Sequence, residues 1–597
     1  MIRGEGLIRP GGQTAAAPGA FRSRLAPWSG FAPEILFLAV TTAAGLWGAG
    51  RWVDPTGDPG VWWSLAGRMA LGERVYRDVY LQYGPLSPYL FLLSGKPFAF
   101  SRSWFLLANW IPAITAGVLL LRLTRQFLSP LERVALAGFL LAVSTFAASP
   151  ARLVLPYSPA AVHALCFALG AILVLQSRDF RKPSRGYAAG VLAGLALCAK
   201  QEIGVAAFLA ISAPIAIEGR RAAGWILRCL GGFAAIAALG AGVVLSTGAS
   251  LESLRLDSHL WPLASVPAGW GGLFRRVAGL STVDRARSLA AAAVQMAKLT
   301  LAISLVAMLL GREKRRWPVG TAAALLALLL AVDLAQGQDL LPRSLPLAWS
   351  MTVAFLTALL AWLDRGRKGR DVLIALGGFA GLVALRTAFS WDPSGPYSGI
   401  THLATTATFT LFLFCFVSGW LPSGETSRRW SRTLWLAVLL PVAWAGAARA
   451  AHGLREPGKV AVTTPRGTVF CGPRAAARFE GIGRQVRPGE QALLLPETHA
   501  LDLLYGMRDV SPLLGHLPGW LDDRAERQLL ARVEANPPDV VILFDRPTRE
   551  FGVEAFGRGY AEALAGWIDR RYAVTAKLPG SVILRPREKP LSSLEIH

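Results

Sequence analysis

The sequence has few charged residues for its size. Only 17% of its 597 residues are Asp, Glu, Lys or Arg, whereas about a quarter would be usual for a soluble protein. Hydrophobic residues make up 53% of the chain, and the mean hydropathy is +0.41. Because apolar runs recur along most of the chain, this composition excludes an ordinary soluble enzyme and predicts an α-helical polytopic membrane protein.

Cysteine is also scarce. The five cysteines are scattered, mostly inside apolar runs, and no Cys-x-x-Cys pair occurs. This spacing supports neither a disulfide framework nor a zinc site. No other residues have recognisable metal-ligand spacing, so the sequence predicts no metal ligands and leaves open whether a divalent cation takes part.

Acidic residues are outnumbered by basic ones, 38 against 62, which gives a formal net charge of +24. The cations sit in short clusters between apolar runs, as in RDFRKPSR (178–185), GREKRRW (311–317) and DRGRKGRD (364–371). Cytoplasmic loops of membrane proteins carry such clusters, whereas a nucleic-acid-binding protein would present one basic face on a folded domain. We therefore predict no nucleic-acid partner.

The apolar runs predict about thirteen transmembrane helices. They lie near residues 31–50, 104–121, 134–148, 156–176, 187–199, 203–217, 229–246, 288–311, 318–333, 345–363, 372–388, 402–420 and 433–450. We interpret 187–217 as two short helices, since one long helix would put the basic loops that flank it on opposite sides of the membrane. The charge distribution then places the N-terminus in the cytoplasm and residues 451–597 outside it.

Three longer segments face outward in this topology: the first loop (51–103), a second loop (247–287) and the tail (451–597). The tail alternates strand-like runs (QALLLPE, DVVILF, SVILRP) with helix-like runs (RAERQLLARVEA, YAEALAGWIDRRY). This alternation predicts a small extracytoplasmic α/β domain after a membrane domain that spans residues 1–450.

The first loop contains DPGVWWSLAGRMALGE (58–73), whose apolar residues recur at helical spacing. The pattern predicts an amphipathic helix at the membrane interface, with Trp62 and Trp63 at the depth of the lipid headgroups. Asp58 stands at the start of this helix, where a carboxylate can cap unpaired backbone N–H groups. A second acid, Asp78, follows in VYRDVYLQYGPLSPY.

The first loop follows the pattern D-x-G-V-x-x-x-x-A-x-R-x-x-x-G-E-x-x-Y-R-D from Asp58, and Q-Y-G-P-L-x-P-Y-L from Gln82. It resembles the first extracytoplasmic loop of GT-C membrane glycosyltransferases. The bacterial branch related to protein O-mannosyltransferases and lipid A aminoarabinose transferases is the most similar. The resemblance extends to the GLALCAKQEIGV turn (194–205), the number of spans, and an outward C-terminal domain with PPDVVILFDR and EFGVEAFGRGY.

This resemblance implies a GT-C fold and transfer of a sugar from a polyprenyl-phosphate donor to an extracytoplasmic protein, lipid or polysaccharide. The catalytic acid of the family falls on Asp58, with Asp54 as the alternative, and the second acidic position falls on Asp78. Aminoarabinose transferases carry Glu-Lys-Pro-Pro where this chain has Gln82-Tyr83-Gly84-Pro85. The resemblance therefore assigns no phosphate ligand at this point.

The chemistry of sugar transfer calls for the same kinds of residue. A carboxylate can deprotonate the acceptor hydroxyl as an oxocarbenium-like state forms. Cations or a bound metal must take up the charge of the departing phosphate. The outward cations that could meet it, or could equally pair with lipid headgroups or nearby acids, are Arg68, Arg74, Arg77, Lys200, Arg255, Arg275 and Arg276.

The candidate substrate-binding residues come from the two outward loops and from the turn between the two short helices. Polar groups at the depth of that turn are either functional or paired with one another. His259 has the alternative of a surface histidine without a role. The full set is Tyr76, Arg77, Gln82, Tyr83, Lys200, Gln201, Glu202 and His259.

Two other classes of function compete with the enzyme. A transporter or flippase of lipid-linked sugars would carry ionisable groups near mid-span and an internal repeat, and this chain has almost no charge in its apolar runs. A sensor or scaffold would leave the first loop unexplained. We therefore predict a multi-pass glycosyltransferase of the cytoplasmic membrane, and the residues specify neither its sugar nor its acceptor.

Overall fold

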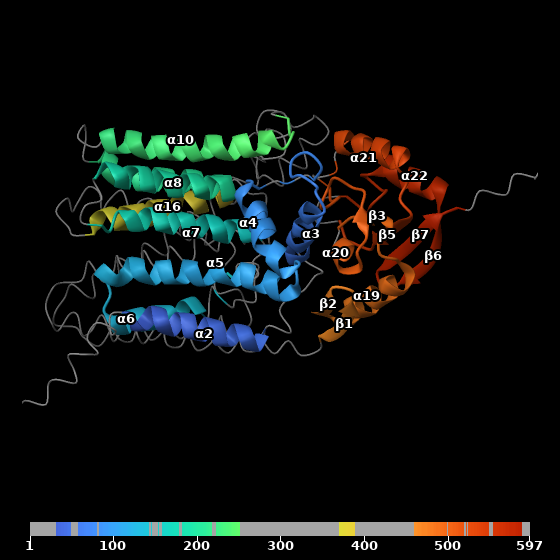
Figure 1. Ribbon diagram of the computed structural model, residues 1–597, viewed down its shortest axis with the longest axis horizontal. Helices are drawn as coiled ribbons and strands as arrows, with labels where there is room; N and C mark the ends of the chain where they lie inside the picture. Colours follow the sequence, from blue (N-terminus) through green and yellow to red (C-terminus); the bar gives the residue numbers. More distant parts are fainter. Residues whose placement is uncertain are drawn as a thin grey trace, which may run out of the picture.

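Helices from the N-terminal two thirds of the chain lie side by side in a bundle, with a sheet-containing domain at one end (Figure 1). The computed structural model describes residues 31–48, 58–79, 81, 83–141, 145, 153–154, 158–177, 182–217, 223–250, 369–388, 459–497, 500–518, 521, 523–548 and 553–587. The described bundle helices are α2 (Ala32–Gly48), α5 (Arg102–Leu123), α6 (Pro130–Leu140), α7 (Pro159–Val174), α8 (Pro183–Ala199), α9 (Gln201–Ala216), α10 (Ala223–Ser246) and α16 (Arg370–Ala388).

Each of these helices overlaps one predicted span. Among the described residues, two helical stretches are long and apolar enough to cross a membrane, Arg102–Gln126 and Ala223–Ser246, while α2, α7 and α9 are apolar but shorter. The predicted spans near 288–311, 318–333, 345–363, 402–420 and 433–450 lie outside the described residues. The helical class is confirmed, and the total number of spans stays a prediction.

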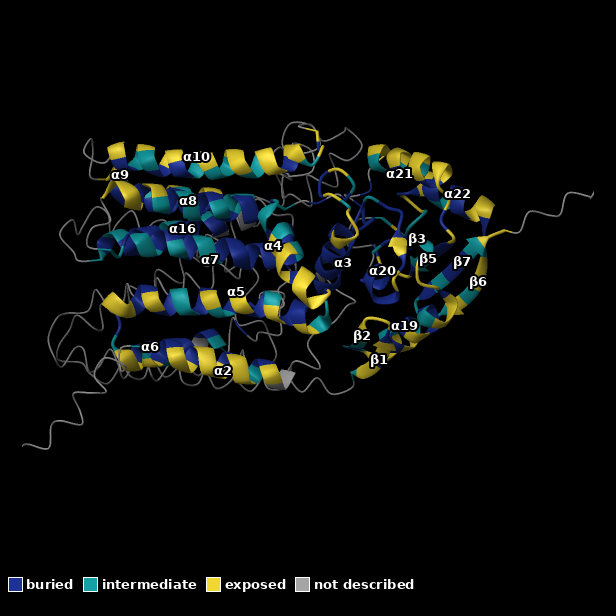
Figure 2. Ribbon diagram, viewed as in Figure 1, coloured by how far each residue is buried: buried dark blue, intermediate teal, exposed yellow. Residues whose placement is uncertain are grey.

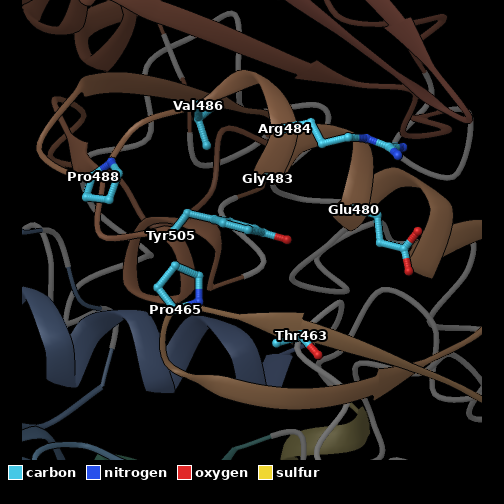
Figure 3. A pocket seen from close by; sticks show the side chains of 8 residues that line it. All are labelled: Thr463, Pro465, Glu480, Gly483, Arg484, Val486, Pro488 and Tyr505. Atoms are coloured by element: carbon cyan, nitrogen blue, oxygen red, sulfur yellow. The ribbon is translucent and has the colours of Figure 1, made fainter.

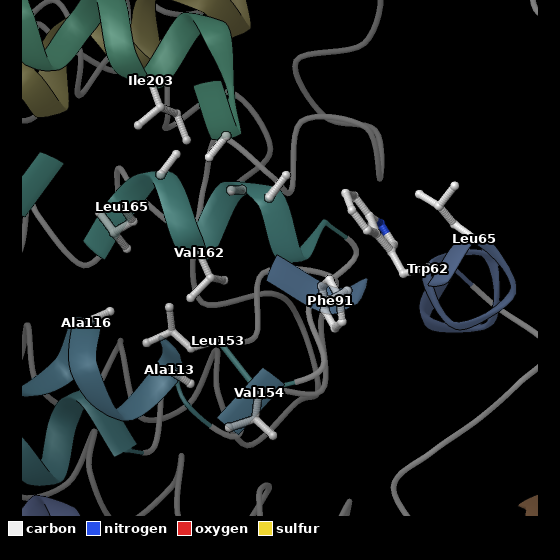
Figure 4. Packing of buried hydrophobic residues seen from close by; sticks show 14 of the residues in the cluster. Trp62, Leu65, Phe91, Ala113, Ala116, Leu153, Val154, Val162, Leu165 and Ile203 are labelled. Carbon is white, nitrogen blue, oxygen red and sulfur yellow. The ribbon is translucent and has the colours of Figure 1, made fainter. Parts of the chain in front are cut away.

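The bundle has an apolar interior and a partly apolar outer surface. Small residues such as Ala113 and Ala116 of α5 pack against Val162 and Leu165 of α7 in its interior (Figure 4). The outer face of α10 is exposed along its length (Figure 2), and Leu239 there is 63% exposed. An apolar face of this extent in contact with solvent would be costly, whereas a bilayer covers it without cost.

Small residues allow the backbones of α8 and α10 to approach closely. A Cβ atom on Gly190 would lie only 2.0 Å from the carbonyl oxygen of Cys229, so this crossing has room for glycine alone. Close packing over small residues is a main source of helix association in membranes, where apolar burial gives no driving force between helices.

The interval 187–217 forms two helices, as predicted. α8 ends at Ala199 and α9 begins at Gln201, with Lys200 in extended conformation between them (φ −150°, ψ 113°). The two helices therefore run in opposite directions. α8 ends at the end of the bundle that faces the C-terminal domain, where the Lys200 turn follows it, and α8 begins at the other end (Figure 1).

The C-terminal domain is built on a five-stranded sheet in the order β4-β3-β5-β7-β6. β3 is parallel to β4 and β5, whereas β7 is antiparallel to β5 and β6. The strands are β3 (Gln491–Leu495), β4 (Arg508–Asp509), β5 (Val540–Phe544), β6 (Tyr572–Leu578) and β7 (Ser581–Pro586). The three strand-like runs of the sequence form β3, β5 and β7, which confirms the α/β prediction for this region.

Helices cover both faces of the sheet. α21 (Asp523–Ala535) and α22 (Glu562–Arg571) share one hydrophobic cluster with it, and α19 (Pro473–Gln485) and α20 (Leu501–Tyr505) pack with the bundle-side cluster. An antiparallel hairpin, β1 (Val460–Thr464) and β2 (Gly467–Cys471), precedes α19. The helix-like runs predicted from the sequence correspond to α21 and α22.

Candidate functional site

The first loop folds between the bundle and the C-terminal domain. Its helix α3 (Asp58–Ala70) is followed by an irregular turn and by α4 (Leu86–Gly95), and α3 lies between α4 and the sheet domain (Figure 1). α3 begins at Asp58, and Pro59 follows in the first turn, where its missing N–H costs nothing. The backbone thus agrees with the predicted helix start. The Asp58 side chain, Asp54, Gln82 and His259 lie outside the described residues.

The prediction that α3 lies at the lipid interface is wrong for its aromatic residues. Trp62 is 4% exposed and Trp63 is fully buried. Trp63 stacks on Phe105 of α5 at 5.4 Å between ring centroids, and its indole N–H donates to the carbonyl oxygen of Phe100 at 2.9 Å. These tryptophans face protein, because α3 packs between α4, α5 and the C-terminal domain.

Asp78 closes the turn that follows α3. Its Oδ2 accepts a hydrogen bond from the backbone N–H of Arg74 at 3.0 Å, and its Oδ1 lies 3.7 Å from Nε of Arg77. The Arg74 guanidinium donates to the carbonyl oxygen of Thr247 after α10 at 2.7 Å. Asp78 therefore has a structural task in the described part of the chain, which is to hold the loop in shape beside the end of α10.

Tyr76 links this turn to the segment before α4. It adopts a left-handed backbone conformation (φ 65°), and its hydroxyl donates to the carbonyl oxygen of Tyr83. The ring of Tyr83 in turn stacks on Trp62 of α3, with 5.3 Å between ring centroids. The turn, the segment before α4 and α3 thus form one interlocked unit.

Lys200, from the turn between α8 and α9, reaches the same unit. Its Nζ lies 4.6 Å from the ring centroid of Tyr83 and 3.2 Å from Oε1 of Glu202. The Lys200 residue is only 3% exposed. A buried ammonium between a carboxylate and an aromatic face is a compact positive charge next to the first loop.

A close backbone contact fixes this arrangement. A Cβ atom on Gly84 would lie 2.1 Å from the carbonyl oxygen of Cys198, near the end of α8. The first loop therefore touches the α8–α9 turn through main chain as well as through Tyr83. Of the predicted substrate-binding residues, Tyr76, Tyr83, Lys200 and Glu202 come together here, and Arg77 and Gln201 lie on the same two turns.

Arg68 belongs to a different cluster from Lys200, because its guanidinium contacts the C-terminal domain. It is 3% exposed, and its guanidinium donates to Oε2 of Glu73 and to the carbonyl oxygen of Ser511, both at 2.6 Å. Asp509 Oδ2 lies 3.7 Å from its Nη1. Arg68 thus pairs with neighbouring acids, one of the two alternatives for the outward cations.

A cleft of about 370 Å³ opens in the C-terminal domain between the β1–β2 hairpin, α19 and the end of α20 (Figure 3). The hydroxyl of Tyr505 donates to the carbonyl oxygen of Phe479 at 2.7 Å. None of the predicted site residues lines this cleft. Its lining consists of Thr463, Pro465, Glu480, Gly483, Arg484, Val486, Pro488 and Tyr505.

No protein-family model matches the chain, and no curated protein matches it significantly in sequence. Among solved structures, it is similar to ArnT from Cupriavidus metallidurans bound to undecaprenyl phosphate, with 12% identity, a TM-score of 0.46, and coverage of 92% of this chain and 97% of that one. It is also similar to the archaeal oligosaccharyltransferase AglB from Archaeoglobus fulgidus in complex with an inhibitory peptide and a dolichol-phosphate. That match has 13% identity, a TM-score of 0.42, and coverage of 85% of this chain and 69% of that one.

Proposed function

We propose that the protein is an integral-membrane glycosyltransferase that moves a sugar from a polyprenyl-phosphate donor to an extracytoplasmic acceptor. One observation carries the proposal. The Lys200 ammonium lies 4.6 Å from the ring centroid of Tyr83, inside the loop unit that includes the helix beginning at Asp58. This proximity of a cation to the helix with the proposed base supports transfer from a phosphate leaving group, which needs both.

In this proposal Asp58 is the general base that takes the proton of the acceptor hydroxyl. Lys200 supplies positive charge to the departing phosphate, a role for which a compact ammonium is suited. It comes from a different segment than the phosphate-binding lysine of aminoarabinose transferases, whose place in the sequence is held here by Tyr83. The partly exposed ring of Tyr83, which stacks on the buried Trp62, offers an aromatic surface for the sugar or for the first isoprene unit.

We assign residues 1–450 to the membrane domain and residues 451–597 to an extracytoplasmic domain. The charge distribution supports this orientation. The Lys200 turn, the described part of the first loop and the C-terminal domain share one end of the bundle, and α8 begins at the opposite end, directly after a basic run in the sequence (Figure 1). Basic segments stay in the cytoplasm, so the end with the site faces outward.

The test compares Asp58→Asn with Asp54→Asn in a strain that lacks the gene. Mass spectrometry of envelope glycans and glycoproteins from the deletion strain first identifies the missing sugar. Asn caps a helix about as well as Asp but cannot act as a base, whose loss costs about 10²–10⁴-fold in rate. We expect Asp58→Asn to be present at normal levels in the membrane and to restore almost no product, while Asp54→Asn restores it.

The opposite pattern, with Asp54→Asn inactive, would move the base to Asp54. Normal product from Asp58→Asn, Asp54→Asn and Asp78→Asn alike would end the proposed mechanism. A separate measurement addresses the donor: purified wild-type protein should bind undecaprenyl phosphate, and Lys200→Met should bind it at least tenfold more weakly. Equal binding by both would remove Lys200 from the donor site.

A further inference from the structure

α3 is joined to the C-terminal domain through buried polar groups as well as apolar ones. The hydroxyl of Ser64 donates to Oδ2 of Asp502 on α20 at 2.6 Å, across 438 positions of the chain. Ser64 is fully buried and Asp502 is 3% exposed. A short hydrogen bond to a buried carboxylate leaves these two elements little freedom to slide past each other.

Arg68, one turn further along α3, makes a second connection. Its guanidinium donates to the carbonyl oxygen of Ser511 at 2.6 Å, lies 3.7 Å from Oδ2 of Asp509, and donates to Glu73 on the first loop. One fully buried cation therefore ties the first loop to two positions of the C-terminal domain. A guanidinium has a rigid, planar set of donors, so it can contact all three groups in one placement only.

The charges around Arg68 also favour this single placement of its guanidinium. Burial raises the pKa of Asp502, and it raises the pKa of Asp509 to about 7. Burial lowers the pKa of His516 to about 3, so this ring stays neutral, with its Nε2 2.6 Å from the hydroxyl of Ser511. The guanidinium is thus the one positive charge among the described side chains of this cluster. Any displacement of α3 would leave buried carboxyl groups without this cation.

We propose that Ser64, Arg68 and Asp502 are positioning residues for the transfer reaction, through which the C-terminal domain holds α3 and its first residue, Asp58, in register with the Lys200 turn. The proposal rests on the proposed function. Ser64 follows Asp58 by six helical residues, or about 9 Å along the axis at ~1.5 Å per residue. α3 is therefore anchored within two turns of the proposed base, and the anchor itself touches no substrate.

An engineered disulfide can test whether position is what these residues supply. A Cβ atom on Gly67 of α3 would lie 3.6 Å from Cβ of Leu503 on α20, within the range of about 3.5–4.5 Å found in disulfides. The double variant Gly67→Cys/Leu503→Cys can thus link α3 to the C-terminal domain covalently, and a reductant removes the link in the same sample. Truncation of Leu503 also removes the atom that a side chain at position 67 would meet, Cδ1 at 2.6 Å.

The experiment combines this tether with Arg68→Met and with the milder Ser64→Ala in the full-length protein. Transfer is measured with radiolabelled undecaprenyl-phosphate sugar and an envelope acceptor fraction, and binding is measured with undecaprenyl phosphate alone. We expect turnover to fall roughly 10²-fold in Arg68→Met and about tenfold in Ser64→Ala. Binding of undecaprenyl phosphate should stay within about twofold, because the Lys200 turn does not depend on the anchor. The matched control is Arg558→Met, whose ion pair with Glu554 is on the surface, with side-chain exposures of 73% and 65%.

When the disulfide tether is formed in the Arg68→Met background, turnover should rise at least tenfold, and reduction of the disulfide should abolish this rise. Full turnover in Arg68→Met and Ser64→Ala, or no recovery after the disulfide has formed, would overturn the proposal. The rate of disulfide formation tests the anchor without any transfer assay, since Arg68→Met should slow it at least tenfold. Absence of transfer by the wild type would instead refute the proposed function, and an unchanged rate of disulfide formation would refute the anchor.

Discussion

The contact between Gly84 and the end of α8 has no room for one additional methyl group. In Gly84→Ala the new Cβ atom would lie 2.1 Å from the carbonyl oxygen and 2.5 Å from the carbonyl carbon of Cys198. Both are main-chain atoms, so no side chain can rotate out of the way. We therefore expect the first loop and the α8–α9 turn to separate in this variant.

The size of the separation follows from the geometry. Ordinary van der Waals contact for a Cβ begins at 3.4 Å, so the loop has to retreat by about 1.3 Å from its present 2.1 Å. Overpacking of this kind costs about 1–3 kcal/mol of stability, which a large membrane protein can tolerate. A misplacement of about 1 Å can nevertheless lower a rate by roughly 10²-fold, because Tyr83 moves away from Lys200.

The matched control is Gly242→Ala in α10, where an added Cβ meets no atom within 4 Å. Both variants are compared by size-exclusion chromatography, thermal unfolding, binding of undecaprenyl phosphate and transfer to an envelope acceptor fraction. Gly84→Ala should remain folded and lose about 10²-fold in turnover, together with part of its donor affinity, while Gly242→Ala should match the wild type. Undiminished turnover in a folded Gly84→Ala would show that the contact between the first loop and Lys200 is not needed for the reaction.

Four further predictions concern the topology and the buried charges. Alkaline phosphatase fused after Gly453 should be active, and an inactive fusion whose fluorescent cytoplasmic counterpart works would reverse the orientation. Gln201→Cys should react with a membrane-impermeant thiol reagent from outside and be protected by undecaprenyl phosphate; labelling from the cytoplasm alone would remove the turn from the site. Asp509 lies in the cluster with Arg68, Glu73, Asp502 and His516, and burial raises its pKa to about 7. Between about pH 4 and 7 its carboxyl group is therefore protonated in the folded state and ionised in the unfolded state. The stability that this group contributes falls as the pH rises through that range. The melting temperature of Asp509→Asn, relative to that of the wild type, should therefore rise from pH 5 to pH 7.5. A difference in melting temperature that does not vary with pH would contradict the raised pKa of Asp509. His516, with its pKa lowered by burial to about 3, contributes the opposite slope below about pH 6.5, and His516→Gln should remove it.

Local patterns predicted much of the fold. The break at Lys200 followed from charge alone, since only two helices keep both basic loops on one side. The runs that form β3, β5 and β7 are apolar because both faces of these strands are covered by helices, and such runs are visible in any sequence. The hairpin of β1 and β2 was missed, because its strands are half-exposed and carry no continuous apolar run.

The candidate site was predicted only where its residues stand in recognisable sequence motifs. Tyr76, Tyr83 and Lys200 stood in motifs, and the structure brings them together. The partners of α3 could not be predicted, because Asp502 belongs to a segment with no motif and lies 438 positions from Ser64. For the same reason Trp62 and Trp63 were assigned to the lipid interface: an amphipathic helix has the same pattern whether a membrane or a protein domain covers its apolar face.

The order of synthesis gives the anchor of α3 a consequence for the assembly of the protein. Ser64 is translated early, and its hydrogen-bond acceptor Asp502 is translated 438 residues later. This interval lasts roughly 20–90 s at ~5–20 residues per second. During that interval Ser64 and Arg68 lack their partners in the C-terminal domain, and α3 is held by its contacts with α4 and α5 alone. If α3 is positioned as proposed, a chain truncated before Asp502 inserts its helices correctly and is still inactive, because the last quarter of the chain completes a site whose other residues lie in roughly the first two hundred positions.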